Sequence, residues 1–445
     1  MKYLPFLLLL FVYNATIAQE KLISGPMLGY VEHREAVIWA EVHQTVKSAE
    51  LKYWKKEQGN RPLKKAFKGK LGQHFNPIKF VLGGLEMNTI YEYELILDGK
   101  TVKRPYPTQF KTKELWEWRK SAPDFSFLAG SCAYVNDSLY DRPSKPYGYK
   151  MNIFETMAKE NSDMMIWLGD NTYTREVDYS SRWGMNYRYS HTRALPQMQA
   201  FLAKMPQFAT WDDHDYGPNN ANKSFRFKEF SKELFDNYWA NASSGQSGQG
   251  IYTQIHHADC DFFLADDRYF RADDRLPDSI AGMPNPEKEF LGKTQLDWLK
   301  NALINSDASF KFICMGSQAL NEATPYDAFH HYPIEYYQLL SFIKDNKIKG
   351  VLFISGDCHN SKVMRLERQG TYPLYDIVSS SLTAGTYKIN ENEKKLIVPG
   401  TMVETQNYTR INVNGAAKSR QLLVEYILSD GTKAGEFSIN QKDLQ

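Results

Sequence analysis

The sequence predicts an α/β protein of layered type, in which an all-β sandwich is followed by a domain of alternating strands and helices. Short runs with alternating apolar and polar residues recur from residue 22 to about residue 113. From Phe125 onward, apolar runs of strand length alternate with amphipathic stretches. The chain has 445 residues, more than one hydrophobic core usually supports. We therefore expect a sandwich over residues 19–113 and a second domain over residues 124–445.

The predicted sandwich rests on runs with a period of two. Residues 36–42 and 90–97 alternate in this way, and Asp98-Gly99 then supplies a turn. Segment 85–93 resembles the tyrosine corner of fibronectin type III-like sandwiches, in which a tyrosine hydroxyl bonds to the backbone a few residues upstream. This resemblance favours a fibronectin III-like sandwich over a barrel.

The second domain contains five short apolar runs of strand length, separated by stretches with helical periodicity. The strand-like runs are residues 125–128, 164–168, 207–211, 310–315 and 351–354, and the helix-like stretches are residues 153–159, 230–239, 294–303 and 334–342. This alternation predicts a layered α/β domain. Further strand-like runs after Tyr372 are expected to complete the edges of its sheet.

Composition and charge exclude several classes of protein. With 42% hydrophobic and 24% charged residues, the chain has the make-up of a packed globular protein. Its 54 basic and 52 acidic residues leave a net charge of +2, so no overall field favours a nucleic acid or an anionic membrane as partner. We expect a monomer with no nucleic-acid partner and no membrane span.

The first residues have the pattern of a signal peptide. Lys2 precedes an apolar run over residues 4–13, and a small-residue motif ends at Ala18. We expect cleavage after Ala18 and export, either to the periplasm or out of the cell. The alternative is a membrane anchor, which needs about 20 apolar residues, roughly twice the length of this run.

Polar residues able to bind metal follow four of the five predicted strands. These groups are Gly130-Ser131-Cys132, Gly169-Asp170-Asn171-Thr172-Tyr173, Asp212-Asp213-His214-Asp215 and Ser355-Gly356-Asp357-Cys358-His359. The carboxyl ends of strands in an α/β sheet meet at one edge, so we expect these groups to be neighbours. Singly, each has an ordinary explanation as a turn, a buried thiol or a hydrogen-bonded histidine. Together they bring several acidic side chains close to one another with no basic residues to balance them. Their negative charges would repel, and bound cations would relieve that repulsion.

As a set, the four motifs resemble those of the alkaline phosphatase D (PhoD-like) family of calcineurin-like metallophosphoesterases, which also carry a β-sandwich ahead of the catalytic domain. The resemblance covers most of the chain. It implies a four-layer α-β-β-α metallophosphoesterase domain over residues 124–445. It also implies an exported, metal-dependent phosphoric-ester hydrolase, an alkaline phosphatase that acts on small-molecule or polymer monoesters, diesters or both.

The resemblance further implies the ligands of the first metal ion. Asp170 would bridge two ions. Cys132 would bind the first ion as thiolate, Tyr173 as phenolate, and His359 would complete the site. A thiolate with a phenolate suits Fe³⁺, and bound metal would deprotonate both groups.

The second ion would take Asp213, where most metallophosphoesterases have Asn, and Asp357, where they have His. Oxygen ligands favour Ca²⁺ over Zn²⁺, and other divalent cations remain possible. The chain departs from most metallophosphoesterases after the run 310–315. They have a histidine there, whereas this chain has Ser317 and Gln318. The amide carbonyl of Gln318 could bind calcium, or the side chain could support another ligand, and Gln318 is therefore left out of the expected ligand set.

The implied mechanism uses a metal-bridging hydroxide that attacks phosphorus in line. His214 and Asp170 would be the catalytic residues, with His214 supporting the leaving group or the developing charge. Arg268 is a candidate for binding the substrate phosphate through its guanidinium. The alternative for Arg268 is an ion pair with a neighbouring aspartate.

Alternatives remain for the substrate and for the activity itself. The same centre would serve a phosphodiesterase or a phospholipase-D-like hydrolase of lipid or polymer diesters. The insert between Tyr173 and Phe201, with Trp183, Tyr187 and Tyr189, could stack a nucleoside, pack on a lipid or form a lid. The non-enzyme alternative is a surface binding protein with a vestigial site. Vestigial sites lose ligands, whereas every expected position here can coordinate metal.

Overall fold

The structure, a computed structural model, describes residues 21–58, 61–141, 143 and 146–445. The predicted signal peptide of residues 1–18 lies outside them. The chain divides into two compact units. The first takes the described residues up to Leu115 with Tyr189–Gln207 and Asn237–Ala240, and the second takes Trp116–Arg188, Phe208–Asp236 and Asn241–Gln445. Among the described helices, none has the length and apolar character needed to cross a membrane.

The first unit contains a β-sandwich. Its strands are β1 (Leu22–Val31), β2 (Glu35–Val42), β3 (Ala49–Lys55), β4 (Leu63–Ala66), β5 (Pro77–Gly83), β6 (Ile90–Leu97), β7 (Lys100–Thr101) and β8 (Gln109–Lys111), with a 3₁₀ turn η1 (Lys56–Gln58). One sheet has the order β1-β2-β5, and the other has β4-β3-β6-β7 with β8 paired to β6. The predicted runs 36–42 and 90–97 are the strands β2 and β6.

The core of the sandwich takes alternate side chains from its strands. In β6 every second residue is buried, as a period of two requires. The rings of Tyr91 and Phe110 stack there with their centroids 5.5 Å apart. The backbone N–H of Glu86 donates to Oη of Tyr91 at 2.9 Å. This bond is the predicted tyrosine corner, and the fibronectin III-like sandwich is confirmed.

The second unit carries the α/β elements. Its strands are β9 (Phe125–Gly130), β10 (Met164–Leu168), β11 (Gln207–Thr210), β12 (Thr253–His257), β13 (Cys260–Leu264), β14 (Ser279–Ile280), β15 (Met283–Pro284), β16 (Phe310–Met315), β17 (Val351–Ser355), β18 (Lys362–Leu366), β19 (Leu374–Val378), β20 (Asn407–Asn414), β21 (Gln421–Leu428) and β22 (Lys433–Asn440). All five predicted apolar runs of this domain therefore form strands.

The helices fall between these strands. They are α2 (Ile153–Met157), α3 (Arg182–Arg193), α4 (Gln199–Lys204), α5 (Asp213–Tyr216), α6 (Lys228–Tyr238), α7 (Gly292–Asn305) and α8 (Pro333–Asp345), with 3₁₀ turns η2 (Pro196–Met198), η3 (Phe329–His331), η4 (Glu391–Leu396) and η5 (Gln441–Leu444). The four predicted helical stretches coincide with α2, α6, α7 and α8. The elements η2 and α4 belong to the first unit.

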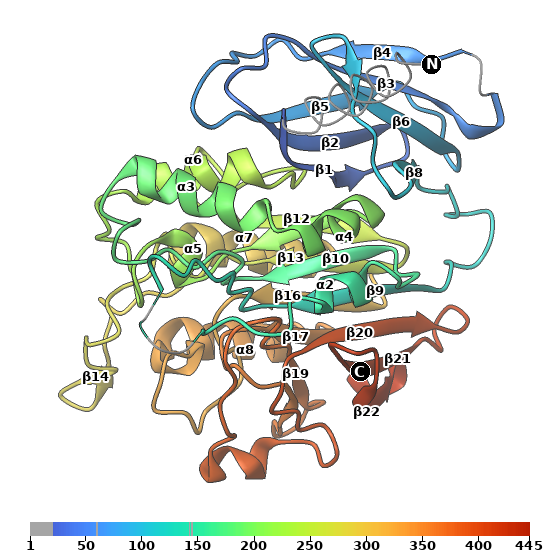
Figure 1. The fold of residues 1–445 in the computed structure, drawn as a ribbon. Coiled ribbons are helices and arrows are strands. Elements are labelled where there is room, and N and C mark those ends of the chain that lie inside the picture. The colour runs from blue at the N-terminus through green and yellow to red at the C-terminus, as the bar shows by residue number, and fades with distance from the viewer. Residues whose placement is uncertain (1–20, 59–60, 142, 144–145) are drawn as a thin grey trace, which may run out of the picture. The chain divides into compact units, whose positions relative to one another are not determined.

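Two six-stranded sheets form the middle of the second unit, with the orders β11-β10-β9-β20-β21-β22 and β12-β13-β16-β17-β19-β18. They face each other, because Phe127 of β9 contacts Phe262 of β13 and Phe312 of β16 at centroid distances of 4.9 and 5.3 Å. On the outer faces, Phe154 of α2 packs on Trp167, and Trp298 of α7 packs on Phe263. The result is the expected four-layer α-β-β-α arrangement (Figure 1).

Parallel pairing decides where the polar motifs lie. Strand β9 pairs in parallel with β10, and β13, β16, β17 and β19 form a second parallel set. The four predicted motifs follow β9, β10, β11 and β17 in the chain. Loops after parallel strands meet at the same edge of a sheet, so residues far apart in the sequence gather there.

Candidate metal centre

Three predicted ligands of the first ion lie together. The ligand atoms of Cys132, Asp170 and His359 are all within 4.8 Å of one another, and the three side chains are buried. The Sγ of Cys132 lies 3.9 Å from Oδ2 of Asp170. Tyr173 joins them, because its Oη lies 3.1 Å from Nε2 of His359. Sulfur, carboxylate, phenol and imidazole thus converge on one position, as the sequence predicted.

A second group shares Asp170 with the first. The ligand atoms of Asp170, Asp213 and His214 also lie within 4.8 Å of one another. Asp213 opens the short helix α5, and its Oδ2 accepts the backbone N–H of Asn220 at 2.6 Å. Asp170 is therefore placed between the two groups, the position expected of a bridging carboxylate. His214 is close enough to serve as a ligand, although we expected it only as a catalytic residue.

Asp357 completes the predicted set. It lines the same cavity as Asp170, Asp213 and His359. The Nε2 of Gln318 donates to Oδ2 of Asp357 at 3.1 Å and to the carbonyl of Asp327 at 3.2 Å, while its Oε1 accepts from Asn321. These partners set the orientation of the Gln318 amide and turn its nitrogen toward Asp357. Gln318 therefore holds the carboxylate of Asp357 in place.

The backbone at these positions is unusual. Cys132, Asp170, Asp357 and His359 all have φ between 50° and 63°. Residues other than glycine seldom adopt this left-handed region, and when they do the strain often marks a functional site. In this structure the left-handed conformation occurs at four of the six predicted metal ligands.

Electrostatics gives a second sign of a cation site. Burial and the neighbouring charges of Asp213 and Asp212 raise the pKa of Asp170 well above its usual value. Burial and Asp213 likewise raise the pKa of Asp357 to about 6. Burial and Asp170 raise the pKa of the Cys132 thiol. Each group resists ionisation because it is enclosed with other acids, and a cation between them removes that cost.

The imidazole of His359 is oriented by a residue that the motifs did not reveal. Its Nδ1 bonds to the carbonyl of Gly385, which can only accept, so Nδ1 carries the proton and Nε2 faces Tyr173. Burial lowers the pKa of His359 to about 4, which keeps the ring neutral near pH 7. A neutral ring with a free Nε2 is the form that binds metal.

Two more supporting residues lie outside the four motifs. The hydroxyl of Ser380 donates to Sγ of Cys132 at 3.1 Å, and Oη of Tyr147 lies 3.1 Å from Nδ1 of His359. Neither follows one of the five predicted strands or belongs to a metal-binding pattern. The sequence carried no signal for them, since only the fold brings Ser380 beside Cys132 and Tyr147 beside His359.

Arg268 requires a correction. Its side chain is 0% exposed and does not line the cavity beside the metal residues. Its Nε donates to Asp212 at 2.6 Å, and its Nη2 donates to Asp327 at 2.7 Å and to Ser317 at 3.1 Å. The structure thus favours the ion-pair alternative over a phosphate clamp, because these partners already occupy the guanidinium.

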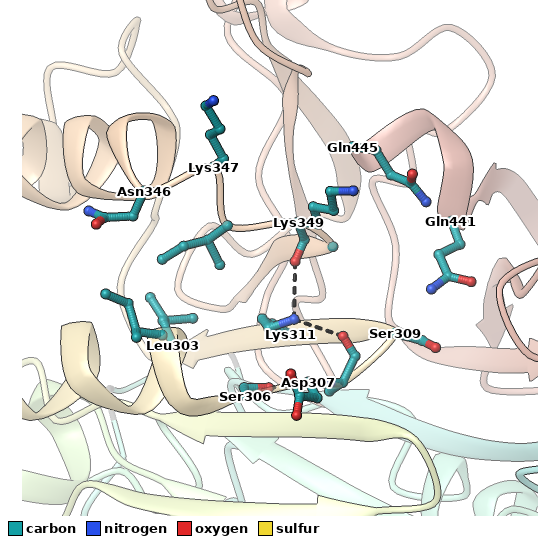
Figure 2. Close-up of a pocket in the computed structure, with 14 residues that line it drawn as sticks. Leu303, Ser306, Asp307, Ser309, Lys311, Asn346, Lys347, Lys349, Gln441 and Gln445 are labelled. Atoms are coloured by element: carbon teal, nitrogen blue, oxygen red, sulfur yellow. Dashed lines mark hydrogen bonds between the residues drawn. The ribbon is translucent and has the colours of Figure 1, made fainter.

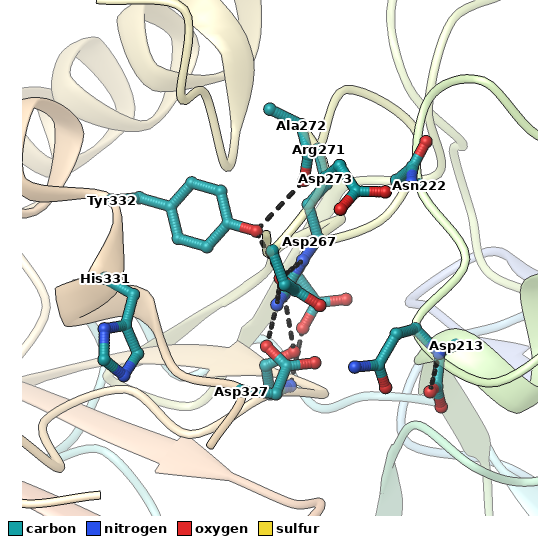
Figure 3. A network of polar contacts seen from close by, with 12 residues as sticks. Asp213, Asn222, Asp267, Arg271, Ala272, Asp273, Asp327, His331 and Tyr332 are labelled. Carbon is teal, nitrogen blue, oxygen red and sulfur yellow. Dashed lines mark hydrogen bonds and ion pairs between the residues drawn. The ribbon is translucent and has the colours of Figure 1, made fainter. Parts of the chain in front are cut away.

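The network around Arg268 continues through Arg271. Figure 3 shows Arg271 directed at Asp327, with the hydroxyl of Tyr332 bonded to the carbonyl of Ala272 at 3.0 Å. Arg268 also lies beside Asp267, at 3.9 Å. Buried guanidinium groups therefore offset the buried acids behind the metal residues, whereas Asp170, Asp213 and Asp357 line the cavity together with Glu176.

The cavity itself has a volume of about 520 Å³ and an aromatic wall. The tyrosines that line it beside Tyr173 are Tyr134, Tyr140, Tyr147, Tyr179 and Tyr387. The insert between Tyr173 and Phe201 contributes only part of this wall, through residues such as Tyr179. The lining residues do not include the predicted stacking surface of Trp183, Tyr187 and Tyr189.

A different cavity, of about 530 Å³, lies where β16 and β17 begin (Figure 2). There Nζ of Lys311 donates to the carbonyls of Ala308 and Lys349 at 2.7 and 3.2 Å. None of the predicted metal residues lines it. It is therefore separate from the metal centre, which lies beyond the other ends of these strands.

The donor set fits a pair of cations. One position is surrounded by thiol, phenol, imidazole and carboxylate groups, and the adjoining position is rich in carboxylate oxygen. These are ligand types that suit an iron-like and a calcium-like ion respectively. A four-layer α-β-β-α unit with such a cluster beyond its strand ends defines the metallophosphoesterase class of fold.

Comparisons with known proteins identify the family. The PhoD-like phosphatase family model matches residues 127–422, and the chain belongs to this family. A second family model, a domain of unknown function (DUF7800), matches residues 19–115. The predicted family resemblance is thereby confirmed.

Individual relatives agree with this assignment. Alkaline phosphatase D of Bacillus subtilis (strain 168) is 26% identical over 321 residues, which are 62% of this chain and 52% of the relative. The chain thus spans about half the length of this curated relative. Among solved structures, that of PhoD has a TM-score of 0.74 at 19% identity and covers 96% of this chain and 92% of its own. The purple acid phosphatase PPD1 of yellow lupin (Lupinus luteus) has a TM-score of 0.67 at 11% identity, covering 94% and 74%. These likenesses show the fold.

Proposed function

We propose that the protein is a metal-dependent phosphoric-ester hydrolase whose metal ligands are Cys132, Asp170, Tyr173, Asp213, Asp357 and His359. The observation that carries the proposal is the convergence of the Cys132, Asp170 and His359 ligand atoms within 4.8 Å. Membership of a phosphatase family supports the same chemistry. The proposed substrates are small or polymeric phosphoesters.

The proposed cations are Fe³⁺, near Cys132, Tyr173 and His359, and Ca²⁺, near Asp213 and Asp357. When bound, such ions lower the pKa of water and neutralise charge on phosphoryl oxygens. Asp170 would serve both positions, because it belongs to both clusters of ligand atoms. The fixed backbone and the Gly385 carbonyl keep His359 ready for binding.

His214 is proposed to handle the proton of the leaving group. In hydrolysis, water supplies the new oxygen on phosphorus, the ester P–O bond breaks, and the organic oxygen takes up a proton. The His214 side chain lines the cavity, and its backbone N–H donates to Oδ1 of Asp170 at 3.2 Å. Its ring lies 4.5 Å from the ring of Tyr173, which limits the orientations it can adopt.

A second candidate activity is the cleavage of diesters. A larger cavity of about 1190 Å³ shares Asp357, Asn219, Asn220 and Tyr387 with the first. It has room for the second substituent of a diester, including a lipid or polymer chain. This feature favours testing a phosphodiesterase or phospholipase-D-like activity beside the monoesterase.

Metal analysis and turnover test the proposal together. The purified protein is expected to contain iron and calcium, to hydrolyse 4-nitrophenyl phosphate or its bis-ester, and to lose this activity after chelation. Restoring Ca²⁺ and iron should restore it. Activity that survives complete metal removal would refute the proposal. Binding of esters without any hydrolysis by the metal-loaded protein would instead support the surface-binding alternative.

We also propose that the chain is exported after cleavage at Ala18, and that the sandwich over residues 19–113 precedes a catalytic domain over residues 124–445. The apolar run over residues 4–13 and the small residues before Gln19 support cleavage there. Sequencing the N-terminus of protein recovered from each cell fraction tests this. A mature chain that begins at Gln19 outside the cytoplasm is expected.

A further inference from the structure

Tyr387 is an exposed aromatic residue at the junction of two cavities. Its side chain is 58% exposed, whereas Tyr173, which lines one of the same cavities, is 4% exposed. It lines both the cavity of about 520 Å³ that contains the metal residues and the adjoining cavity of about 1190 Å³. An ester whose phosphoryl group lies beside Asp357 can therefore place its organic group against Tyr387.

The ring of Tyr387 is held in place. It stacks on the ring of His359, with centroids 5.1 Å apart and planes inclined by 19°. Its hydroxyl lies 3.0 Å from the hydroxyl of Tyr147, which in turn bonds to His359. The backbone N–H of Tyr387 donates to the carbonyl of His359 at 3.0 Å. A ring positioned in this way loses little conformational freedom when a ligand stacks on it.

One face of this ring is covered by His359, so its exposed area lies on the other face and at the edge. The larger cavity also contains Tyr326, which is 71% exposed. Exposed rings beside a cavity contribute stacking energy to flat π systems, in addition to the apolar contact that they offer to any organic group. The chemistry recognised here is therefore a planar aromatic ring.

We propose that Tyr387 determines specificity by stacking on a flat ring in the organic group of the substrate. The enzyme would thereby favour aryl and nucleoside phosphates over aliphatic phosphoesters. This inference rests on the proposed phosphoric-ester hydrolysis and names the class of substrate for that same site. Tyr387 acts on binding and takes no part in bond cleavage.

The test compares 4-nitrophenyl phosphate, a nucleoside 5′-monophosphate and glycerol phosphate as substrates of the metal-loaded protein. The variant Tyr387→Ala is expected to raise KM by about tenfold for the two ring-bearing esters, and by less than about twofold for glycerol phosphate. Tyr387→Trp should keep the preference. Tyr337→Ala is the matched control, because Tyr337 is also 58% exposed but lies on α8 away from both cavities.

Calorimetry supplies a readout that does not depend on turnover. The Kd of a nucleoside 5′-phosphonate, whose P–C bond an ester hydrolase does not cleave, should rise by about tenfold in Tyr387→Ala, while the Kd of inorganic phosphate stays unchanged. Equal losses for all ligands would overturn the proposal and indicate that Tyr387 only supports His359. No change for any ligand would also overturn it. If no ester is hydrolysed by the wild-type protein, the proposed function fails, and the binding measurements still decide whether Tyr387 stacks on rings.

Discussion

The Sγ of Cys132 lies 3.9 Å from the carboxylate of Asp170, although 38 residues separate them in the chain. Both side chains are buried, and both residues have a left-handed backbone. Burial and Asp170 raise the pKa of the Cys132 thiol, and burial raises the pKa of Asp170, so a cation between them would favour the ionised forms that bind metal. This pair is the most direct structural sign of a metal centre.

Replacing the thiol of Cys132 should remove one bound metal ion. We expect Cys132→Ser to lose bound iron, since a hydroxyl is a poor substitute for thiolate, and to lower kcat by at least about a hundredfold. Elemental analysis and steady-state kinetics measure both effects. Cys314→Ala is the matched control, because Cys314 is equally buried within β16. Full iron content in Cys132→Ser would exclude Cys132 as a ligand.

One substitution can show whether His214 transfers protons or binds metal. If it handles protons, His214→Gln should keep both metal ions and lower kcat by about 10²- to 10⁴-fold. Its ligand atom lies within 4.8 Å of those of Asp170 and Asp213, so loss of an ion is the competing outcome. Metal content and kcat measured on the same preparation separate the two roles. Wild-type turnover would rule out both.

Chelation should destabilise the folded protein. Asp170, Asp213 and Asp357 line one cavity, and without cations their charges repel. A ligand present at about 1,000 times its Kd stabilises the folded state by about 4 kcal/mol, so a fall in Tm is expected when the metal is removed. Differential scanning calorimetry before and after metal removal measures this fall. An unchanged Tm would mean that these acids do not hold a cation.

The buried guanidinium of Arg268 should contribute to stability. Arg268→Met would leave the buried Asp212 without its cation and Asp327 with Arg271 alone, and we expect a loss of about 3–5 kcal/mol in the free energy of unfolding. Urea denaturation measures it. Arg275→Met is the control, because the Arg275 side chain is 91% exposed and should contribute nothing measurable. Equal stability of the two variants would contradict this role.

Glu41 should make the stability of the protein depend on pH. It is 1% exposed and accepts a hydrogen bond from Tyr238 at 2.9 Å, and burial raises its pKa from 4.5 to about 7. A raised carboxyl pKa means that the folded state binds this proton more tightly than the unfolded state does, so protonation of Glu41 stabilises the fold. The stabilisation is complete below pH 4.5 and is lost as pH rises through about 7.

The variant Glu41→Gln keeps an acceptor for Tyr238 but cannot ionise. Its Tm should therefore fall less than that of the wild type as pH rises from about 5 to about 8. Glu57→Gln, at an exposed position of η1, is the control and should follow the wild type. Parallel curves for Glu41→Gln and the wild type would show that Glu41 does not titrate in this range.

Much of the fold could be predicted because it depends on local pattern. A period of two marked β2 and β6, and apolar runs marked β9, β10, β11, β16 and β17. The Tyr91 corner was visible because its hydrogen bond to Glu86 spans only five residues. Strand β12 was not predicted, since Ile255 is the one apolar residue among Thr253–His257.

The candidate site could be predicted in part for the same reason. Cys132, Asp170, Asp213, Asp357 and His359 stand directly after strands, so their meeting follows from parallel pairing. Arg268 was ambiguous, because a guanidinium near aspartates can bind phosphate or pair internally. Its burial, and its bonds to Asp212 and Asp327, depend on chain segments that the sequence does not bring together.

By itself, the sequence determined the family, the order of the predicted domains and the candidate ligand types, because periodicity and motif spacing are properties of neighbouring residues. Only the tertiary structure decided that Gly385 orients His359, that Ser380 supports Cys132 and that Tyr387 stands between two cavities. These contacts join residues separated by 26 to 248 positions, and they exist only after the sheets have packed.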